Sequence, residues 1–172
     1  MALIPAAWAQ AINRATRRVP SWPIYVLALA WAAWLLWQGA TGALGPEPIN
    51  TLERRYGELA LQGLVAGLVV TPLRVWTGIS LLKFRRALGL AAFGFVLAHV
   101  AVWAVLDLQS LSRIGEELVK RPYITIGFAG FTALIPLAAT SNAVSIRRLG
   151  ASGWRRLHRL TYAAVLLGAV HY

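Results

Sequence analysis

The chain has 172 residues, of which 58% are hydrophobic and only 13% are charged, against roughly 25% charged residues in soluble domains. This composition excludes an ordinary soluble domain and indicates an integral membrane protein. Seventeen Lys and Arg against six Asp and Glu give a net charge of +11, but the basic residues form short clusters between apolar runs. That placement indicates membrane topology and contact with anionic headgroups rather than nucleic-acid binding.

Residues 1–18 are expected to form a cytoplasmic amphipathic leader that lies at the membrane interface, followed by one transmembrane domain over residues 19–172. The basic start resembles that of a signal peptide, but the uncharged run that follows is long enough to stay in the bilayer as a first span. We place this span at about residues 22–40. Its five aromatic residues are interpreted as an interfacial belt.

A second apolar run, residues 59–73, is short for a span of about 20 residues, so its helix is expected to begin earlier, near residues 51–55. Pro72 and Arg74 are expected to end this helix. The alternative is that the run does not cross the membrane, in which case the topology of every later segment would invert.

The third run, residues 87–106, contains His99, and the nearly neutral loop 107–121 follows it. The fourth run, residues 122–146, begins with Pro122, a favourable first residue of a helix, and Pro136 is expected to kink it.

The fifth run begins at about Trp154 and reaches the last residue, Tyr172. The basic clusters of the chain alternate with weakly charged segments, so the positive-inside rule places the N-terminus and both basic loops in the cytoplasm. The expected fold class is therefore an all-α bundle of transmembrane helices with five spans.

Two of the three histidines are expected to lie at the same depth on parallel spans. His99 comes 13 residues after Arg86, and His171 comes 15 residues after Arg156. Two neutral imidazoles on adjacent helices are the axial ligands of a b-type haem, and with no cysteine in the chain any haem must be held non-covalently. The alternative is that each histidine only bonds a neighbouring helix. Three glycines are expected to permit close helix approach: Gly89, Gly94 and Gly168.

The third histidine, His158, is expected at the cytoplasmic edge, about 20 Å from His171 if one helix carries both. At about 100° per residue their side chains would point about 140° apart, so they need not face one groove. No histidine is found at the matching depth on the third span. His158 could be solvated, ligate a second haem opposite another ligand or an open position, or border a quinol or flavin site. Arg155 and Arg156 would pair there with haem propionates or a phosphate.

Six segments together resemble one bacterial family, the MsrQ (YedZ) haem-binding membrane subunits of the protein-methionine-sulfoxide reductase system. They are PINTLERRYGELAL, VVTPLR, RRALGLAAFGFVLAHV, KRPYITIGFAGF, LAATS and LGASGWRRLHRLTYAAVLLGAVHY. The resemblance runs from about residue 45 to the last residue. That family belongs to the ferric-reductase-like transmembrane proteins, which include the membrane domains of NADPH oxidases.

The resemblance implies a b-type cytochrome of the inner membrane with one haem or two, ligated by His99, His171 and His158, and an FMN is also attributed to members. Electrons would come from the quinone pool or a cytoplasmic flavin reductase and pass to a periplasmic molybdopterin enzyme that reduces methionine sulfoxide. The sequence contains no nucleotide-binding fingerprint, so electrons must arrive from another molecule. We therefore expect an electron-transfer subunit without catalytic nucleophile or acid–base pair.

The chain departs from the family's pattern in two ways. Members have six spans, and here the fifth run reaches the end of the sequence, so the sixth is expected to be absent. The wider superfamily pairs two histidines on the third span, where this sequence has only His99. Two other functions stay open: a transmembrane ferric or cupric reductase, and a non-redox membrane anchor or transporter subunit whose histidines only pack helices.

Overall fold

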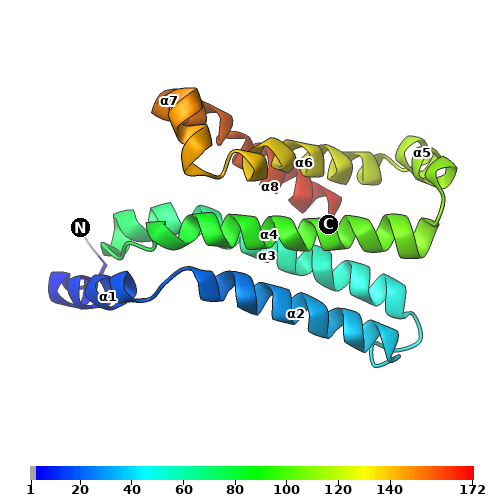
Figure 1. Ribbon diagram of the computed structural model, residues 1–172, viewed down its shortest axis with the longest axis horizontal. Coiled ribbons are helices and arrows are strands. Elements are labelled where there is room, and N and C mark those ends of the chain that lie inside the picture. Colours follow the sequence, from blue (N-terminus) through cyan, green and yellow to red (C-terminus); the bar gives the residue numbers. More distant parts are fainter. Residues whose placement is uncertain (1–2) are drawn as a thin grey trace.

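The computed structural model describes residues 3–172, and within them the chain is helical without strands, which confirms the all-α expectation (Figure 1). The elements in chain order are α1 (Ala6–Arg18), α2 (Trp22–Ala40), α3 (Pro48–Thr77), α4 (Leu82–Ala101), the π-helix η1 (Val102–Leu108), α5 (Leu111–Lys120), α6 (Pro122–Ala139), α7 (Ala143–Leu157) and α8 (Leu160–His171).

Four helices are long and apolar enough to cross a membrane: α2, α3, α4 continued by η1, and α6. The fifth apolar helix, α8, is shorter, with 12 residues. Apart from the length of α8, these helices correspond to the five expected spans. The expected loop 107–121 contains two elements that the apolar pattern did not indicate, the end of η1 and the amphipathic helix α5.

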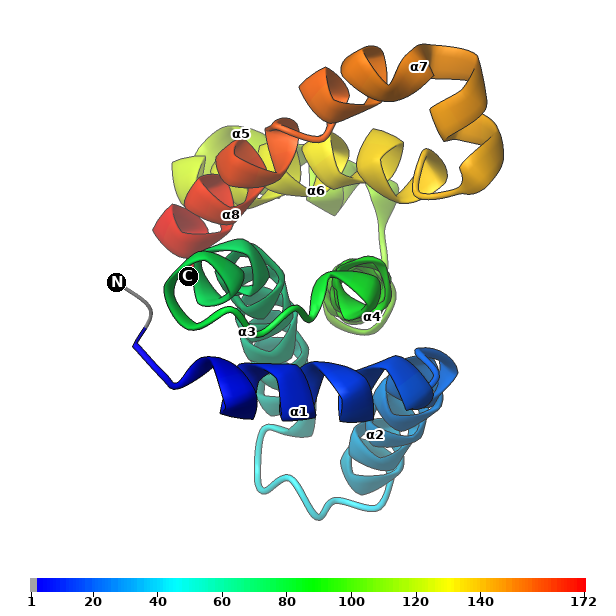
Figure 2. The ribbon, with the colours of Figure 1, turned by 90° about the vertical axis from the view of Figure 1, so that its left-hand side faces the viewer.

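The helices pack in three layers (Figure 2). The pair α3 and α4 forms the middle layer, α2 packs on one side of it, and the antiparallel pair α6 and α8 packs on the other. One apolar core joins α2 to α3 and α4, around Leu35, Tyr56 and Phe95. A second core joins the middle pair to α6 and α8, around Leu64 and Leu134. The second core encloses the space in which the site described below lies.

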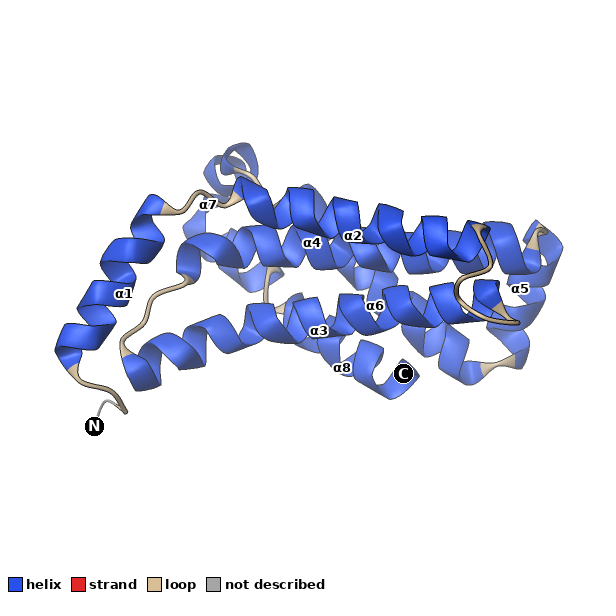
Figure 3. Cartoon of the chain, turned by 90° about the horizontal axis from the view of Figure 1, so that it is seen from below, coloured by secondary structure: helices blue, strands red, loops and turns tan. Residues whose placement is uncertain are grey.

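The basic and the weakly charged connections lie at opposite ends of the bundle. Figure 1 shows α1, α7 and the α3–α4 connection at one end, with α5 and the α2–α3 connection at the other. The helix α1 turns away from the direction of the long helices (Figure 3). Asn13 fixes it to the α3–α4 connection, where its side chain donates to the Gly78 carbonyl (2.9 Å) and accepts from the Ser80 amide (2.7 Å).

The expected end of the second span at Pro72 is wrong, because α3 continues through this proline to Thr77. A proline removes only one intrahelical hydrogen bond, that to the carbonyl four residues earlier. The helix ends instead at Gly78, whose φ of 76° lies in the left-handed region and whose amide donates to the Arg74 carbonyl (2.9 Å). This is a glycine cap of the usual kind.

The expected end of the fourth span near residue 146 is also wrong, because α6 ends at Ala139. The hydroxyl of Thr140 donates to the Pro136 carbonyl (2.6 Å) and so satisfies one of the free carbonyls at the helix end. Asn142 then caps a new helix, α7, by accepting a hydrogen bond from the Ser145 amide (2.8 Å). Short polar side chains at 140–142 therefore turn the chain before the next charged residue is reached.

The fifth span begins at Leu160 rather than at about Trp154, which belongs to α7. His158 lies in the turn between α7 and α8. His158 and His171 are therefore not carried by one continuous helix, and the angle of an ideal helix does not describe their relative directions.

Gly78→Ala is expected to lower the free energy of unfolding by about 1–2 kcal/mol, because a Cβ atom disfavours the left-handed conformation. Thermal unfolding of the detergent-solubilised protein, followed by circular dichroism, measures the effect. Gly115→Ala is the matched control, since Gly115 lies inside α5 with nothing within 4 Å of an added Cβ. An equal loss of stability in both variants would contradict the role assigned to Gly78.

Candidate functional site

His99 on α4 and His171 on α8 lie side by side in the bundle. Their ring centroids are 6.0 Å apart and their ring planes meet at 73°. The expected match in depth between the two spans is thus confirmed as a juxtaposition of these two imidazoles. The two rings come from different helix pairs, because α4 packs against α3 while α8 packs against α6.

Both imidazoles are held in the same way, through Nδ1. The Nδ1–H of His99 donates to the backbone carbonyl of Glu53 on α3 (2.9 Å), and that of His171 donates to the carbonyl of Tyr123 on α6 (2.7 Å). A carbonyl can only accept, so these bonds fix the tautomer and leave Nε2 of each ring with a free lone pair. Within residues 3–172 neither Nε2 has a hydrogen-bond partner. Histidines that bind a metal ion through one ring nitrogen usually donate the other N–H to a carbonyl in this way.

Each carbonyl is accessible because a glycine follows it by four residues. Gly57 lies over the ring of His99, where an added Cβ would come within 3.3 Å of Nδ1. Gly127 lies against the face of His171, where an added Cβ would come within 2.6 Å of Cγ and Nδ1. A helical side chain covers the turn before its own Cα, so a bulky residue at either position would crowd the imidazole, and at Gly127 even a Cβ would overlap it.

These are not the glycines that the sequence indicated. An added Cβ at Gly89 or Gly94 meets nothing within 4 Å, and at Gly168 the nearest contact is 3.7 Å. The expectation that Gly89 and Gly94 permit the close approach is therefore wrong, whereas the backbone of Gly168 does lie close to α6, 3.7 Å from a Cβ added at Gly130. The glycines that lie against the two rings are Gly57 and Gly127.

The two histidines line a cavity of about 720 Å³ between α3, α4, α6 and α8. This volume falls within the range of roughly 300–1,000 Å³ for small-molecule and cofactor sites. The cavity walls in the middle of the helices are apolar, and include Ala60, Leu61, Leu64, Val96, Phe131, Leu134 and Ala164. The cavity can therefore hold a large, mostly apolar molecule beside the two imidazoles.

The polar residues of the cavity come from the ends of elements at the α5 end of the bundle. They are Asn50, Glu53 and Arg54 from the start of α3, Asp107 from η1, Glu117 and Arg121 beside the α5–α6 junction, Tyr123 from α6 and Tyr172. Arg54 and Arg121 contribute the positive charge among them. Neither arginine was predicted from the sequence, because charged segments at this end were interpreted only as topology signals. Gly57 and Gly127 were not predicted either, because hydropathy does not show which side of a helix faces a ring.

The third predicted residue, His158, lies apart from this pair. Its Nε2 is 3.1 Å from the hydroxyl of Thr140, which itself donates to Pro136, so His158 donates this bond. Its ring stacks on Trp154 with centroids 3.8 Å apart. Burial lowers the pKa of His158 below its usual value, and the nearby Arg85 guanidinium lowers that pKa further. Both effects favour the neutral form of His158 in the α7–α8 turn.

Arg155 and Arg156 are exposed on the last turn of α7, next to His158 in sequence and outside the cavity of His99 and His171. The structure therefore divides the predicted residues into two groups. His99 and His171 come together at the α5 end, while His158 and the two arginines stay at the basic end.

The His99–His171 pair offers two imidazole ligands, and this number limits which metal ions it could hold. Within residues 3–172 no group of three or more His, Cys, Asp or Glu side chains could hold a bare metal ion. Two imidazoles that share one metal ion need about 6 Å between ring centres, from two metal–nitrogen bonds of about 2 Å and the ring radii. The observed distance of 6.0 Å between the ring centroids is thus compatible with two imidazoles that share one metal ion.

The chain was compared with known proteins. The family model described as "Ferric reductase like transmembrane component" matches residues 56–169. The "Protein-methionine-sulfoxide reductase heme-binding subunit MsrQ" of Agrobacterium fabrum is 47% identical over 152 residues, which cover 88% of this chain and 70% of that protein. The protein of the same name from Brucella anthropi is 44% identical over 171 residues, which cover 97% of this chain and 77% of that protein. The protein of the same name from Brucella ovis is 47% identical over 152 residues, which cover 88% of this chain and 69% of that protein. No solved structure matches the chain.

The family match includes most of α3, all of α4, α6 and α7, and most of α8, so it covers His99 and His158 and stops just before His171. The MsrQ relatives extend the similarity over most of the chain. The chain thus belongs to the MsrQ family within the ferric-reductase-like transmembrane proteins.

Proposed function

We propose that this protein is a b-type cytochrome subunit that carries electrons across the bacterial inner membrane to a periplasmic methionine-sulfoxide reductase. The observation that carries the proposal is the pair of adjacent imidazoles, His99 and His171, at one cavity between four helices. The printed names of the relatives, which are heme-binding subunits, support it.

The residues present fit a haem b. Both Nδ1 atoms are committed to backbone carbonyls, so each histidine offers Nε2 as a neutral ligand. The walls of the cavity are apolar in the middle of the bundle and polar at one end, which matches a flat macrocycle that carries its carboxylates on one edge. Bound haem iron supplies one-electron chemistry, and the protein supplies the axial ligands, the orientation and a water-poor surrounding.

The direction of transfer is proposed from the charge distribution. The basic connections lie at the end of α1 and α7, and this end is cytoplasmic by the positive-inside rule. The cavity of His99 and His171 opens at the opposite, periplasmic end, where a molybdopterin enzyme could take electrons. His158 lies at the cytoplasmic end, where a quinol, a flavin reductase or an FMN would deliver them.

The test is the spectrum of the purified protein. We expect a haem-to-protein ratio of at least one and a reduced-minus-oxidised difference spectrum of a six-coordinate b-type cytochrome. The protein purified without any reducible haem would overturn the proposal and leave the non-redox anchor. Flavin fluorescence of the same sample tests for FMN.

A second experiment tests the electron acceptor. After reduction with a quinol, the spectrum of the protein is expected to return to the oxidised form when the periplasmic molybdopterin subunit and methionine sulfoxide are added. Two electrons and two protons then convert each sulfoxide to the thioether and water. Equally fast oxidation by ferric citrate without that subunit would favour the alternative, a transmembrane ferric reductase.

A further inference from the structure

Helix α1 is bound to the rest of the protein by one of its faces. Ala9, Asn13 and Thr16 recur at helical spacing on this face, where Ala9 is buried and Asn13 bonds the α3–α4 connection. Lys83 at the start of α4 donates from Nζ to the carbonyls of Thr16 (2.9 Å) and Arg17 (3.0 Å) in the last turn of α1. These contacts hold α1 across the end of the bundle (Figure 2).

A second face of α1 is apolar and exposed. Trp8, Ile12 and Ala15 recur at helical spacing there, and the Trp8 side chain is 69% exposed. We call these three residues the apolar face. Val75 and Trp76 at the end of α3 are exposed at the same end of the bundle. Exposed tryptophans beside apolar residues are typical of the boundary between lipid headgroups and acyl chains.

A third face of α1 is basic. Arg14 and Arg18 lie one turn apart, and Arg17 lies beside them, so we call these three residues the basic face. All three are exposed. Within residues 3–172, no acidic side chain lies within ion-pair distance of their guanidinium groups. The basic face therefore presents positive charge that the protein itself does not neutralise.

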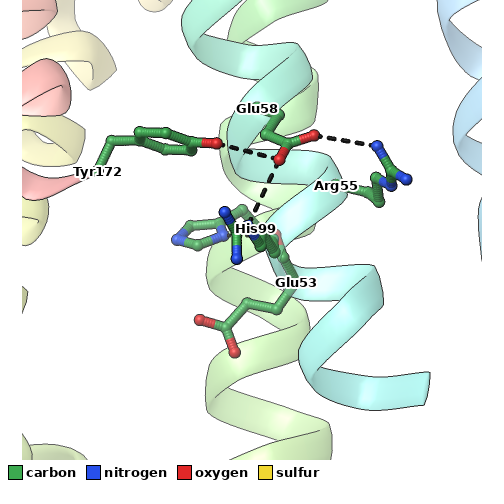
Figure 4. A network of polar contacts seen from close by, with 6 residues as sticks. Glu53, Arg55, Glu58, His99 and Tyr172 are labelled. Carbon is green, nitrogen blue, oxygen red and sulfur yellow. Dashed lines mark hydrogen bonds and ion pairs between the residues drawn. The ribbon is translucent and has the colours of Figure 1, made fainter. Parts of the chain in front are cut away.

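The charges at the opposite end of the bundle compensate each other. The six acidic residues of the chain lie in α5, in η1, in the first half of α3 and directly before α3. Figure 4 shows one of them, Glu58, which accepts hydrogen bonds from Tyr172 (3.0 Å) and Arg55 (3.3 Å). All ion pairs among residues 3–172 lie at this end. The end that carries α1 is thus left complementary to an anionic surface.

The apolar face distinguishes between two kinds of anionic partner, a lipid surface and an acidic protein. Charge alone suits both. A helix in the plane of the membrane needs an apolar side for the acyl chains beside a basic side for the headgroups, and α1 has both. It also turns away from the direction of the long helices, as a helix at the membrane surface must (Figure 3). The observations therefore favour a lipid surface.

We propose that α1 binds anionic phospholipids. Its apolar face enters the boundary between headgroups and acyl chains, and its basic face binds the headgroup phosphates. Arginine is suited to this role because its planar guanidinium can donate two hydrogen bonds to one phosphate. The inference goes beyond the proposed function and does not depend on haem or on electron transfer.

A fluorophore on α1 tests the inference in the full-length protein. The chain has no cysteine, so one introduced cysteine can carry a single environment-sensitive label. Ala15→Cys places the label on the apolar face, and Gln10→Cys places it beside the basic face, both at exposed positions. When phosphatidylglycerol is added to the detergent-solubilised protein, we expect the emission at position 15 to move to shorter wavelength and that at position 10 to change little.

The charge of the lipid and of the helix should both matter. Phosphatidylcholine is expected to cause the same emission shift only at a roughly hundredfold higher concentration, from about fivefold for each of three arginines. In the Ala15→Cys protein, Arg14→Gln and Arg18→Gln should each raise the required phosphatidylglycerol concentration about fivefold and leave the response to phosphatidylcholine unchanged. Arg113→Gln, which removes an exposed arginine of α5 at the opposite end, should change neither response.

Three results would overturn the inference. One is an equal response of position 15 to both lipids, and another is an equal effect of Arg113→Gln and the α1 variants. The third is that neither lipid shifts the emission at position 15, which would leave this surface to a partner protein with an acidic surface. The comparison of the two lipids needs no arginine variant, so it decides even where such a variant fails to fold. None of these results bears on haem binding, which the spectrum of the purified protein tests separately.

Discussion

Replacing His99 or His171 by alanine is expected to abolish the haem at the outer site, whereas His158→Ala is expected to retain most of it. Either of the first two changes removes one of two imidazoles whose rings are 6.0 Å apart in the cavity. His158 instead bonds Thr140 and stacks on Trp154, and it does not line that cavity. The ratio of haem to protein and the difference spectrum of each purified variant measure the effect.

Two controls separate loss of a ligand from loss of fold. The helical content of all three variants should match that of the wild-type protein, because none of these histidines belongs to a buried apolar core. Haem b added together with free imidazole should restore a six-coordinate spectrum to His171→Ala, since the truncated side chain leaves room at the cavity. Equal haem loss in all three variants would contradict the separation of His158 from the pair.

The sequence was sufficient to predict the class of fold and that His99 and His171 lie close together. Long apolar runs mark membrane helices because backbone groups in a bilayer must bond within the helix. Counting residues from the two arginine pairs then predicted how deep each histidine lies in the membrane, since both spans run in the same direction from a basic connection. Depth is a one-dimensional quantity, and a helix converts sequence into depth almost linearly.

Helix boundaries were harder to predict because local bonds decide them. Pro72 appeared to end a span but is tolerated inside α3, while Gly78 ends the helix by its left-handed conformation. The absence of charge up to residue 146 suggested a longer fourth span than the one that Thr140 and Asn142 end. Hydropathy reports where a residue can be buried, and it does not report whether a side chain bonds a free carbonyl at a helix end.

The surroundings of the histidines could not be predicted from depth alone. Which glycine faces a ring depends on the rotation of each helix about its own axis, and apolar residues on all sides of these spans leave that rotation undetermined. A partial signal existed for Gly127. It lies five residues after Pro122, the first residue of α6, and α6 runs antiparallel to α8, whose last residue is His171. The same counting of depth, applied to antiparallel helices, places the two side by side.

Gly127→Ala is expected to remove most of the bound haem, although it adds only one methyl group. The new Cβ would lie 2.6 Å from Cγ and Nδ1 of His171, closer than any nonbonded contact of carbon allows. The ring must then rotate and lose its bond to the Tyr123 carbonyl, or α6 and α8 must separate. Overpacking of this kind costs about 1–3 kcal/mol, which corresponds to a loss of haem affinity of about 5-fold to 150-fold.

Two matched substitutions are expected to lower haem affinity less than Gly127→Ala does. At Gly57 the added Cβ would lie 3.3 Å from Nδ1 of His99, so a small shift accommodates it and an intermediate loss of haem follows. At Gly94 nothing lies within 4 Å, so Gly94→Ala should bind haem as the wild-type protein does. The order of haem affinity is therefore wild type and Gly94→Ala first, then Gly57→Ala, then Gly127→Ala. If Gly127→Ala bound haem as tightly as Gly94→Ala, the glycine would not hold the imidazole in place, and His171 would reach the cavity by another arrangement of α6 and α8.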